Sequence, residues 1–239
     1  MIAQPWIPPN LWEDGDCWII GGGTSMPRQF GIPEDVILSV MKGESYPSAY
    51  TPYLSALHKE HVIGINNAYQ LGSWITFEFF GDFNWYLQHK LYLAEWDGIK
   101  VSSATKFGTI RYEGVKYMPK NERKYDGICD VPGMVSWNGN SGIASLSLAY
   151  QLGVKRIFLL GFDMKLDENN VSHWHGSHHP DPSKRLTSNP MKRMSAFNRH
   201  TKTIPEVVVD ARKLGLEILN VNPDSAIEEF PKIKLEQIL

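Results

Sequence analysis

Cysteines and long hydrophobic runs are scarce in this chain of 239 residues. Cys17 and Cys129 are its two cysteines, too few for a disulfide framework, and we expect both to lie in the core. The longest nearly apolar run, residues 157–162, is far shorter than the roughly 20 residues that a membrane-spanning helix needs. The opening MIAQPWIPPN has neither the basic nor the apolar segment of a secretory signal. We therefore expect no membrane span and a location in a reducing cytoplasm.

A surplus of charge of either sign is also absent. Lys and Arg total 24 against 26 Asp and Glu, which gives a net charge of −2. Without a basic surplus, binding to nucleic acid is not expected, and a hydrophobic fraction of 42% argues against disorder. At the usual 100–200 residues per domain, the length predicts a single α/β domain over residues 1–239. The composition does not exclude that the chain forms a homo-oligomer.

Short apolar runs alternate with helical patterns along the chain. Strands are expected where such runs end at Gly, Asn or Asp, at residues 17–20, 61–65, 74–80, 99–107, 154–160 and 216–221. Helical spacing predicts helices near residues 32–42, 85–93, 140–152 and 203–214. Residues 112–132 show no clear periodicity. This alternation predicts a mainly parallel, doubly wound sheet of the Rossmann-like α/β class.

Two of these helices carry specific signals at their ends. Asn140 or Ser141 is expected to cap the helix that Gly153 ends. The sequence Thr203-Ile204-Pro205-Glu206 has the spacing of a capping box, and Gly215 is expected to end the helix that follows.

Polar and glycine-rich segments follow several predicted strands. In a parallel sheet, ligands bind beyond the carboxyl ends of the strands. This rule selects Gly21-Gly22-Gly23-Thr24-Ser25, Asn66, Asn67, Asp82 and Asp163. The two carboxylates could hold a ribose or Mg²⁺, or could cap a following turn. The two asparagines could bond a base or a sugar, or could serve turn chemistry alone.

The glycine-rich segment suits a ligand that contacts the backbone. Glycine has no Cβ, so backbone N–H groups of residues 21–25 could approach a phosphate or a ribose. Met26 stands where the third glycine of G-x-G-x-x-G would be, and the Gly-Lys-Ser/Thr of a P-loop is missing. A ligand-facing loop and a plain tight turn both remain open.

Four of the eight histidines lie within residues 173–179. Three roles are open for them: a metal site, general acid–base catalysis, or a solvated mobile loop. No cysteine is near and the spacing is not H-E-x-x-H, which disfavours a metal. We expect residues 164–201 to form a loop or lid insertion. Positive charge that would suit a phosphate, or simply a solvated face, follows at Lys184, Arg185, Lys192, Arg193 and Arg199.

The order of these motifs resembles that of two related protein groups. Ile19–Met26, Gly64–Tyr69, Asn140–Ala144 and Leu159–Asp163 follow one another as in the bacterial sialyltransferases that have a single Rossmann-like domain. They also resemble the proteins related to archaeal 6-hydroxymethylpterin diphosphokinase, a group with many bacterial and phage members. The likeness covers residues 17 to about 225 and is weakest over 86–135.

The sialyltransferase resemblance implies a nucleotide-dependent transferase. Its partners would be a CMP-type nucleotide donor and an acceptor. The nucleotide would be surrounded by residues 21–25, Asn66, Ser141 and Gly142, with Asn140 beside them. His173, in Ser172-His173-Trp174, would be the general base that deprotonates an acceptor hydroxyl, a displacement that needs no tightly held metal.

The second resemblance implies a different reaction. The Gly-Gly-Gly-x-Ser loop and Asp82 are closer to the diphosphokinase-like group. That group implies Mg²⁺-dependent transfer of pyrophosphate from ATP, with Asp82 and Asp163 as metal or ribose ligands. A third alternative is a phage or prophage accessory protein that keeps the fold without turnover.

Overall fold

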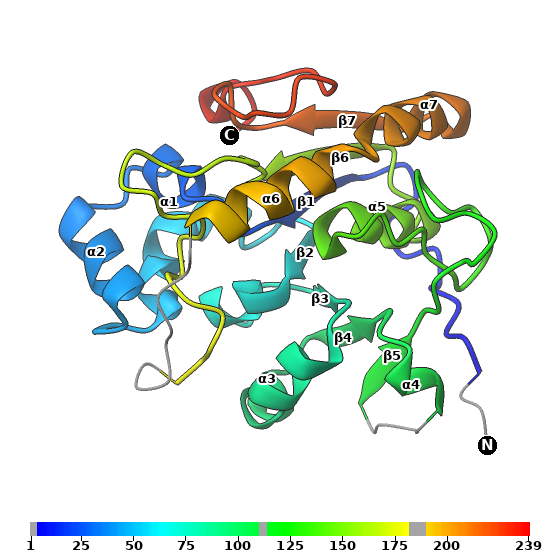
Figure 1. The fold of residues 1–239 in the computed structure, drawn as a ribbon, viewed down its shortest axis with the longest axis horizontal. Coiled ribbons are helices and arrows are strands. Elements are labelled where there is room, and N and C mark those ends of the chain that lie inside the picture. Colours follow the sequence, from blue (N-terminus) through cyan, green and yellow to red (C-terminus); the bar gives the residue numbers. More distant parts are fainter. Residues whose placement is uncertain (1–3, 110–113, 182–189) are drawn as a thin grey trace.

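Seven parallel strands form the centre of the computed structural model, which describes residues 4–109, 114–181 and 190–239. Their order is β5-β4-β3-β2-β1-β6-β7, and all the strand pairs are parallel (Figure 1). The strands are β1 (Asp16–Ile20), β2 (Val62–Ile65), β3 (Phe77–Phe80), β4 (Ile99–Ser102), β5 (Val115–Tyr117), β6 (Arg156–Leu160) and β7 (Glu217–Asn220). This confirms the predicted doubly wound α/β class.

Helices cover both faces of the sheet because alternate strand residues point to opposite sides. In β1, Cys17 and Ile19 join the core beneath α5 (Ser141–Gln151) and α7 (Ile204–Leu214), whereas Trp18 and Ile20 join the opposite core. The second layer consists of α2 (Glu34–Lys42), η1 (Pro47–Leu57), η2 (Asn66–Leu71) and α3 (Phe83–Glu95). Shorter elements are α1 (Ser25–Gln29), α4 (Lys106–Thr109) and η4 (Leu235–Gln237).

Two predicted strands are at least three residues shorter than expected. The run at 74–80 forms a strand over Phe77–Phe80, and that at 99–107 ends at Ser102. The Ser102 hydroxyl donates to the Phe80 carbonyl and accepts from the Ala104 amide, which turns the chain out of the sheet before α4. Strand β5 lies in the stretch without clear periodicity, where no element was predicted.

Two of the predicted helix ends are confirmed, and one predicted cap is wrong. The Asn140 side chain accepts a hydrogen bond from the Gly142 amide, which confirms it as the cap of α5, and Gly215 ends α7 at a φ of 67°. The predicted capping box at Thr203 is wrong, because Thr203 has helical backbone angles and its side chain makes no capping bond. An N-cap side chain needs an extended backbone to turn back to the helix.

Residues 164–201 are less loop-like than expected. Their last part is helix α6 (Pro190–Thr201), which crosses the carboxyl ends of the central strands in Figure 1. Residues 182–189, with Lys184 and Arg185, lie outside the described part of the chain. None of the helices in the described ranges has the length and hydrophobicity that a membrane crossing requires.

Candidate functional site

A cavity of about 450 Å³ lies at the carboxyl ends of β1 and β6. The strand order reverses between these two neighbours, so the loops after them part toward opposite faces of the sheet. The volume is in the range of small-molecule sites. Its lining brings together most of the residues that the sequence selects: Gly21, Gly22, Gly23, Asn66, Asp82, Asn140, Ser141, Gly142, Asp163 and His173. Thr24, Ser25 and Asn67 are not among the lining residues.

The glycine-rich segment at residues 21–25, called the glycine loop below, packs closely against neighbouring parts of the chain. The Gly21 and Gly23 amides donate to the carbonyls of Leu160 and Gly161, so the loop continues along the end of β6. A Cβ atom on Gly22 would lie 2.7 Å from His173 Nδ1, and one on Gly21 would lie 2.8 Å from the Gly161 carbonyl oxygen. Neighbouring groups of the protein therefore require glycine at these two positions. The missing Cβ atoms also leave room for a ligand to approach the backbone.

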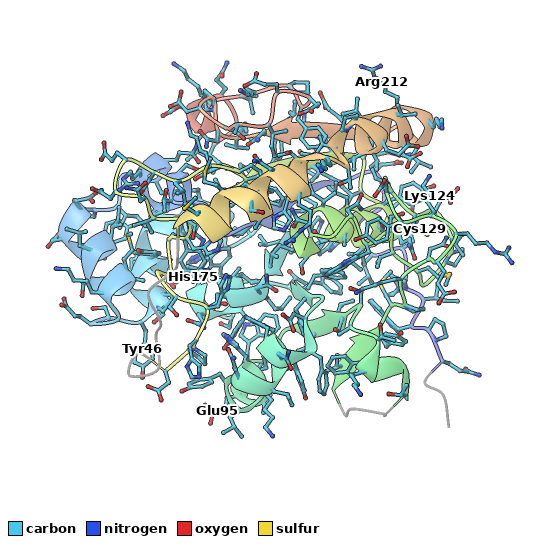
Figure 2. The ribbon with its side chains drawn as sticks, in the orientation of Figure 1. Tyr46, Glu95, Lys124, Cys129, His175 and Arg212 are labelled. Carbon is cyan, nitrogen blue, oxygen red and sulfur yellow. The ribbon has the colours of Figure 1, made fainter. Side chains whose placement is uncertain are left out.

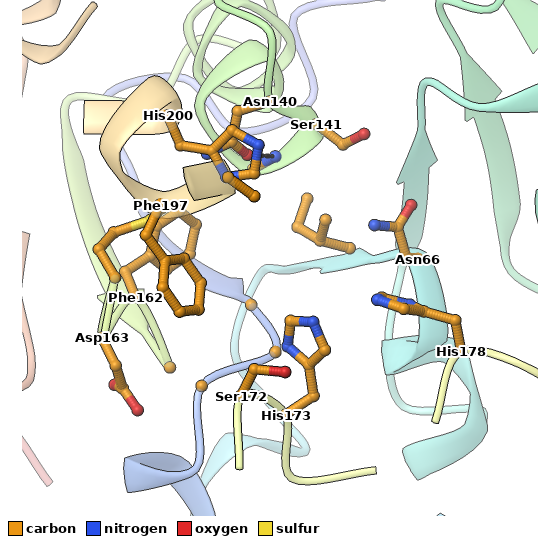
Figure 3. Close-up of a pocket in the computed structure, with 18 of the residues that line it drawn as sticks. Asn66, Asn140, Ser141, Phe162, Asp163, Ser172, His173, His178, Phe197 and His200 are labelled. Atoms are coloured by element: carbon orange, nitrogen blue, oxygen red, sulfur yellow. Dashed lines mark hydrogen bonds between the residues drawn. The ribbon is translucent and has the colours of Figure 1, made fainter. Parts of the chain in front are cut away.

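The two aspartates hold the walls of the cavity. The buried Asp163 carboxylate accepts from the Ser25 amide at 2.9 Å, the Ser25 hydroxyl at 2.5 Å and Asn222 Nδ2 at 2.8 Å, and it is turned away from the cavity centre (Figure 3). Asp82 caps α3 by accepting from the Asn84 amide at 2.7 Å. The Asp82 side chain therefore serves as a helix cap. Asp163 connects the glycine loop to the chain after β7 through its hydrogen bonds.

The two asparagines after β2 point in different directions. Asn66 has a φ of 57° and its side chain faces the cavity (Figure 3). Asn67 is 1% exposed, and its side chain binds Trp85 and the carbonyls of Ser177 and His178. Asn67 thus supports the histidine-rich segment, residues 172–179, by binding two of its backbone carbonyls.

The histidine-rich segment is packed against the glycine loop. Trp174 donates its amide to the Gly22 carbonyl at 2.9 Å and its indole N–H to the Gly21 carbonyl at 2.8 Å. Ser172, Trp174 and His175 are buried, and in the view of Figure 2 His175 lies within the outline of the molecule, whereas Glu95 and Arg212 lie at its edge. This burial contradicts the solvated-loop alternative for these residues.

Three imidazole rings form a cluster beside the cavity. The His173 ring centroid is 5.0 Å from that of His175 and 4.6 Å from that of His178, and His175 and His178 are 5.0 Å apart. His173 and His178 line the cavity. Within the described ranges, no three His, Cys, Asp or Glu side chains are arranged to hold a metal ion.

The N-terminus of α5 forms the wall opposite His173 (Figure 3). The first amides of a helix have no partner within it and carry a partial positive charge, which favours an anion. Asn140 Nδ2 is also buried and has no hydrogen-bond partner among the described residues. This end of the cavity can therefore bind a phosphate.

Several lining residues escaped the sequence analysis. Phe162 follows β6, and Phe197 and His200 are three residues apart on α6 and so share a face. Burial lowers the pKa of His200, with a smaller contribution from Arg199. The i, i+3 spacing of Phe197 and His200 could have indicated that they share a helix face. The neighbouring sequence does not indicate that this face covers the ends of β1 and β6.

No protein-family model matches this chain, and no curated protein matches it significantly. Among solved structures, the MAf glycosyltransferase from Magnetospirillum magneticum AMB-1 aligns with 100% of this chain at 12% identity and a TM-score of 0.54. The chain shares its fold with part of a glycosyltransferase. It spans 36% of that protein's length.

Two further structures have lower scores. Both are of the sialyltransferase CstII from Campylobacter jejuni, one with cytidine-5'-monophosphate and one with CMP-3FNeuAc. They align with 91% of this chain, and this chain covers 84% and 85% of theirs. The identities are 12% and 14%, with TM-scores of 0.48 and 0.46.

Replacing Gly22 with alanine is expected to lower the free energy of unfolding by about 1–2 kcal/mol, because the new methyl group would overlap His173 and force its ring to move. Urea unfolding measures this change. Gly15→Ala is the control, since its Cβ would contact the Trp12 carbonyl at 3.2 Å, away from the cavity. Equal losses in the two variants would contradict a specific contact between Gly22 and His173.

Proposed function

We propose that this chain is a glycosyltransferase that binds a CMP-type sugar donor in the cavity and transfers the sugar to an acceptor hydroxyl. The observation that carries the proposal is a shared cavity. An imidazole, His173, and the N-terminus of α5 line the same space of about 450 Å³. One can accept a proton and the other can bind a phosphate. The fold shared with a glycosyltransferase supports this assignment.

The walls suggest how the donor lies. Its phosphate is placed beside Ser141 and Gly142 at the N-terminus of α5, where the Gly142 amide is already bonded to Asn140 Oδ1. The ring of Phe197 offers an apolar surface to the base (Figure 3), whereas the buried ring of Phe162 packs against Gly142. Asn66 and the glycines of the glycine loop also line the cavity, where they can contact the sugar.

The proposed reaction is a direct displacement. The acceptor O–H bond breaks, and its proton passes to the neutral imidazole of His173. The acceptor oxygen then bonds to the anomeric carbon of the sugar while the bond from that carbon to the phosphate oxygen breaks. The electron pair of the broken bond leaves with the nucleotide, whose negative charge the α5 N-terminus stabilises.

Binding of CMP is the first test. CMP, CDP, UDP, ADP and ATP are each added with Mg²⁺ and with EDTA, and the melting temperature is recorded. Ligand at about 100 times its Kd adds about 2.7 kcal/mol, and each kcal/mol shifts Tm by about 2–4 °C in a chain of this size. We expect CMP and CDP to stabilise the protein in EDTA. Stabilisation by ATP only with Mg²⁺ would instead favour diphosphoryl transfer, and no shift would leave a partner-binding protein.

Asn140→Asp tests where the phosphate binds. Asparagine and aspartate cap helices about equally well, so α5 and the stability of the fold are retained. The buried donor Nδ2, however, becomes a negatively charged oxygen in a residue that lines the cavity. We expect CMP to bind about tenfold more weakly by calorimetry, with the affinity for free cytidine nearly unchanged. Equal affinities for CMP in the two proteins would place the phosphate elsewhere.

A further inference from the structure

The backbone carbonyl of His178 is held from behind by two buried side chains. His89 Nε2 on α3 lies 2.6 Å from this oxygen, and Asn67 Nδ2 at the start of η2 lies 3.3 Å from it. His89 is 0% exposed, so water does not replace either donor. A carbonyl oxygen has two lone pairs, and here both are used by side chains.

The two donors are themselves oriented by neighbours. Tyr69 lies 2.9 Å from His89 Nδ1, and Trp85 Nε1 donates to Asn67 Oδ1 at 2.9 Å while its ring stacks on His89 at 4.1 Å. Because a carbonyl can only accept, His89 Nε2 carries the proton and Nδ1 accepts from the Tyr69 hydroxyl. Burial lowers the pKa of His89 to about 4, so the ring is neutral at physiological pH. We call Asn67, Tyr69, Trp85 and His89 the carbonyl clamp.

The histidine-rich segment has its other anchor at Trp174. Trp174 donates to the carbonyls of Gly21 and Gly22, and its own carbonyl accepts from the Tyr50 hydroxyl at 3.3 Å. Between the two anchors the chain has no regular secondary structure and turns at Gly176, with a φ of 68°. The position of His178 therefore depends on the carbonyl clamp. His178 in turn contacts the His173 ring edge to face, at 4.6 Å between centroids.

We propose that His89 and Asn67 are positioning residues that set the place of His178, and through it of the His173 ring, in the cavity. The effect of this positioning on catalysis rests on the proposed function, whereas the positioning itself can be measured in the free protein. The clamp residues other than Trp85 do not line the cavity, so they act through the segment that they hold. A merely structural role would instead leave the histidine rings unchanged when the donor is removed without loss of bulk.

His89→Leu and His89→Gln separate these two roles. Leucine keeps the bulk and removes the donor, whereas glutamine places an N–H group near the position of Nε2. His58→Leu is the matched control, because His58 stacks on Trp74 at 4.9 Å and belongs to the same layer. Two measurements use the free protein: amide hydrogen exchange over residues 172–181, and NMR titration of the His173 and His178 rings. A third is the steady-state rate of transfer from CMP-sugar.

We expect His89→Leu to speed exchange of the segment about tenfold and to shift both titration curves, while His89→Gln and His58→Leu stay within about threefold of the parent. In transfer, His89→Leu should lower kcat about tenfold with KM for the donor nearly unchanged, and glutamine should restore it. Unchanged exchange and titration in His89→Leu would overturn the positioning proposal.

The outcomes distinguish this proposal from the proposed function. If the parent binds no nucleotide, the proposed function fails, yet exchange and titration in the free protein still decide whether the clamp positions the rings. If His89→Leu does not fold, Trp85→Phe serves instead, since it keeps an aromatic ring and removes the N–H that orients Asn67. It is expected to change exchange and titration in the same direction by about threefold. An exchange pattern identical to the parent's would again overturn the proposal.

Discussion

Replacing His173 with asparagine is expected to lower the rate of sugar transfer about a thousandfold, because a general base contributes roughly 10²–10⁴ to such a step. Asparagine keeps a polar side chain beside the glycine loop but cannot accept a proton at neutral pH. Binding of CMP should change less than threefold, since the phosphate is placed at α5, across the cavity (Figure 3). Steady-state kinetics and calorimetry measure the two quantities separately.

The neighbouring imidazole provides the control for this experiment. His178 also lines the cavity, 4.6 Å from His173 between centroids. His178→Asn should lower kcat by about tenfold at most, because it removes a contact of the base and not the base itself. If His178→Asn proves the slower variant, the assignment of the base to His173 is wrong.

Lowering the pH from about 7 to 4 is expected to reduce the free energy of unfolding by about 3 kcal/mol through His89 alone. Burial lowers the pKa of this ring from 6.5 to about 4. Between these two values the unfolded chain binds a proton that the folded chain does not. The stabilisation is therefore complete above pH 6.5 and is lost as the pH falls toward 4.

Glu78 is expected to have the opposite effect at higher pH. Its side chain is 0% exposed in β3, no hydrogen bond of normal geometry reaches its oxygens from the described residues, and burial raises its pKa well above 4.5. The folded chain then holds a proton that the unfolded chain loses. Stability from this group is complete below the unfolded pKa of 4.5 and declines as the pH rises toward the folded value.

Urea unfolding from pH 4 to 9 tests both groups. His89→Gln should remove most of the decline on the acid side while keeping the bond to His178, and Glu78→Gln should reduce the decline on the alkaline side. The difference between each variant and the parent isolates one residue from the other titrating groups. If the variants keep the parent's slopes, the two side chains are not the source of the pH dependence.

The apolar runs predicted the central strands because burial on both faces of a parallel sheet requires such sequences. The runs around Ile19, Ile63 and Leu159 became β1, β2 and β6, and Asn140 capped α5 as expected. The signals that failed were local patterns overruled by neighbours. Ser102 turned the chain out of the sheet, and the helical backbone at Thr203 prevented its side chain from capping α7.

The candidate site was predicted in outline from strand ends. The rule that ligands bind there selected residues 21–25, Asn66, Asn67, Asp82 and Asp163, and all of these except Thr24, Ser25 and Asn67 line the cavity. The rule could not separate the two adjacent asparagines, because the direction of Asn67 depends on Trp85, eighteen positions along the chain. It also could not reveal Phe197, whose helix reaches the cavity only through the path of the folded chain.

By itself, the sequence determined the central strands β1, β2 and β6, the helices α2, α3, α5 and α7, and the polar residues that follow the strands. These properties depend on local spacing and backbone preference. Tertiary structure decided the rest: the strand order that opens the cavity between β1 and β6, the need for glycine at position 22 beside His173, and the hold of His89 on the His178 carbonyl. Such contacts join residues far apart in the chain, and only the packing of the folded chain brings them together.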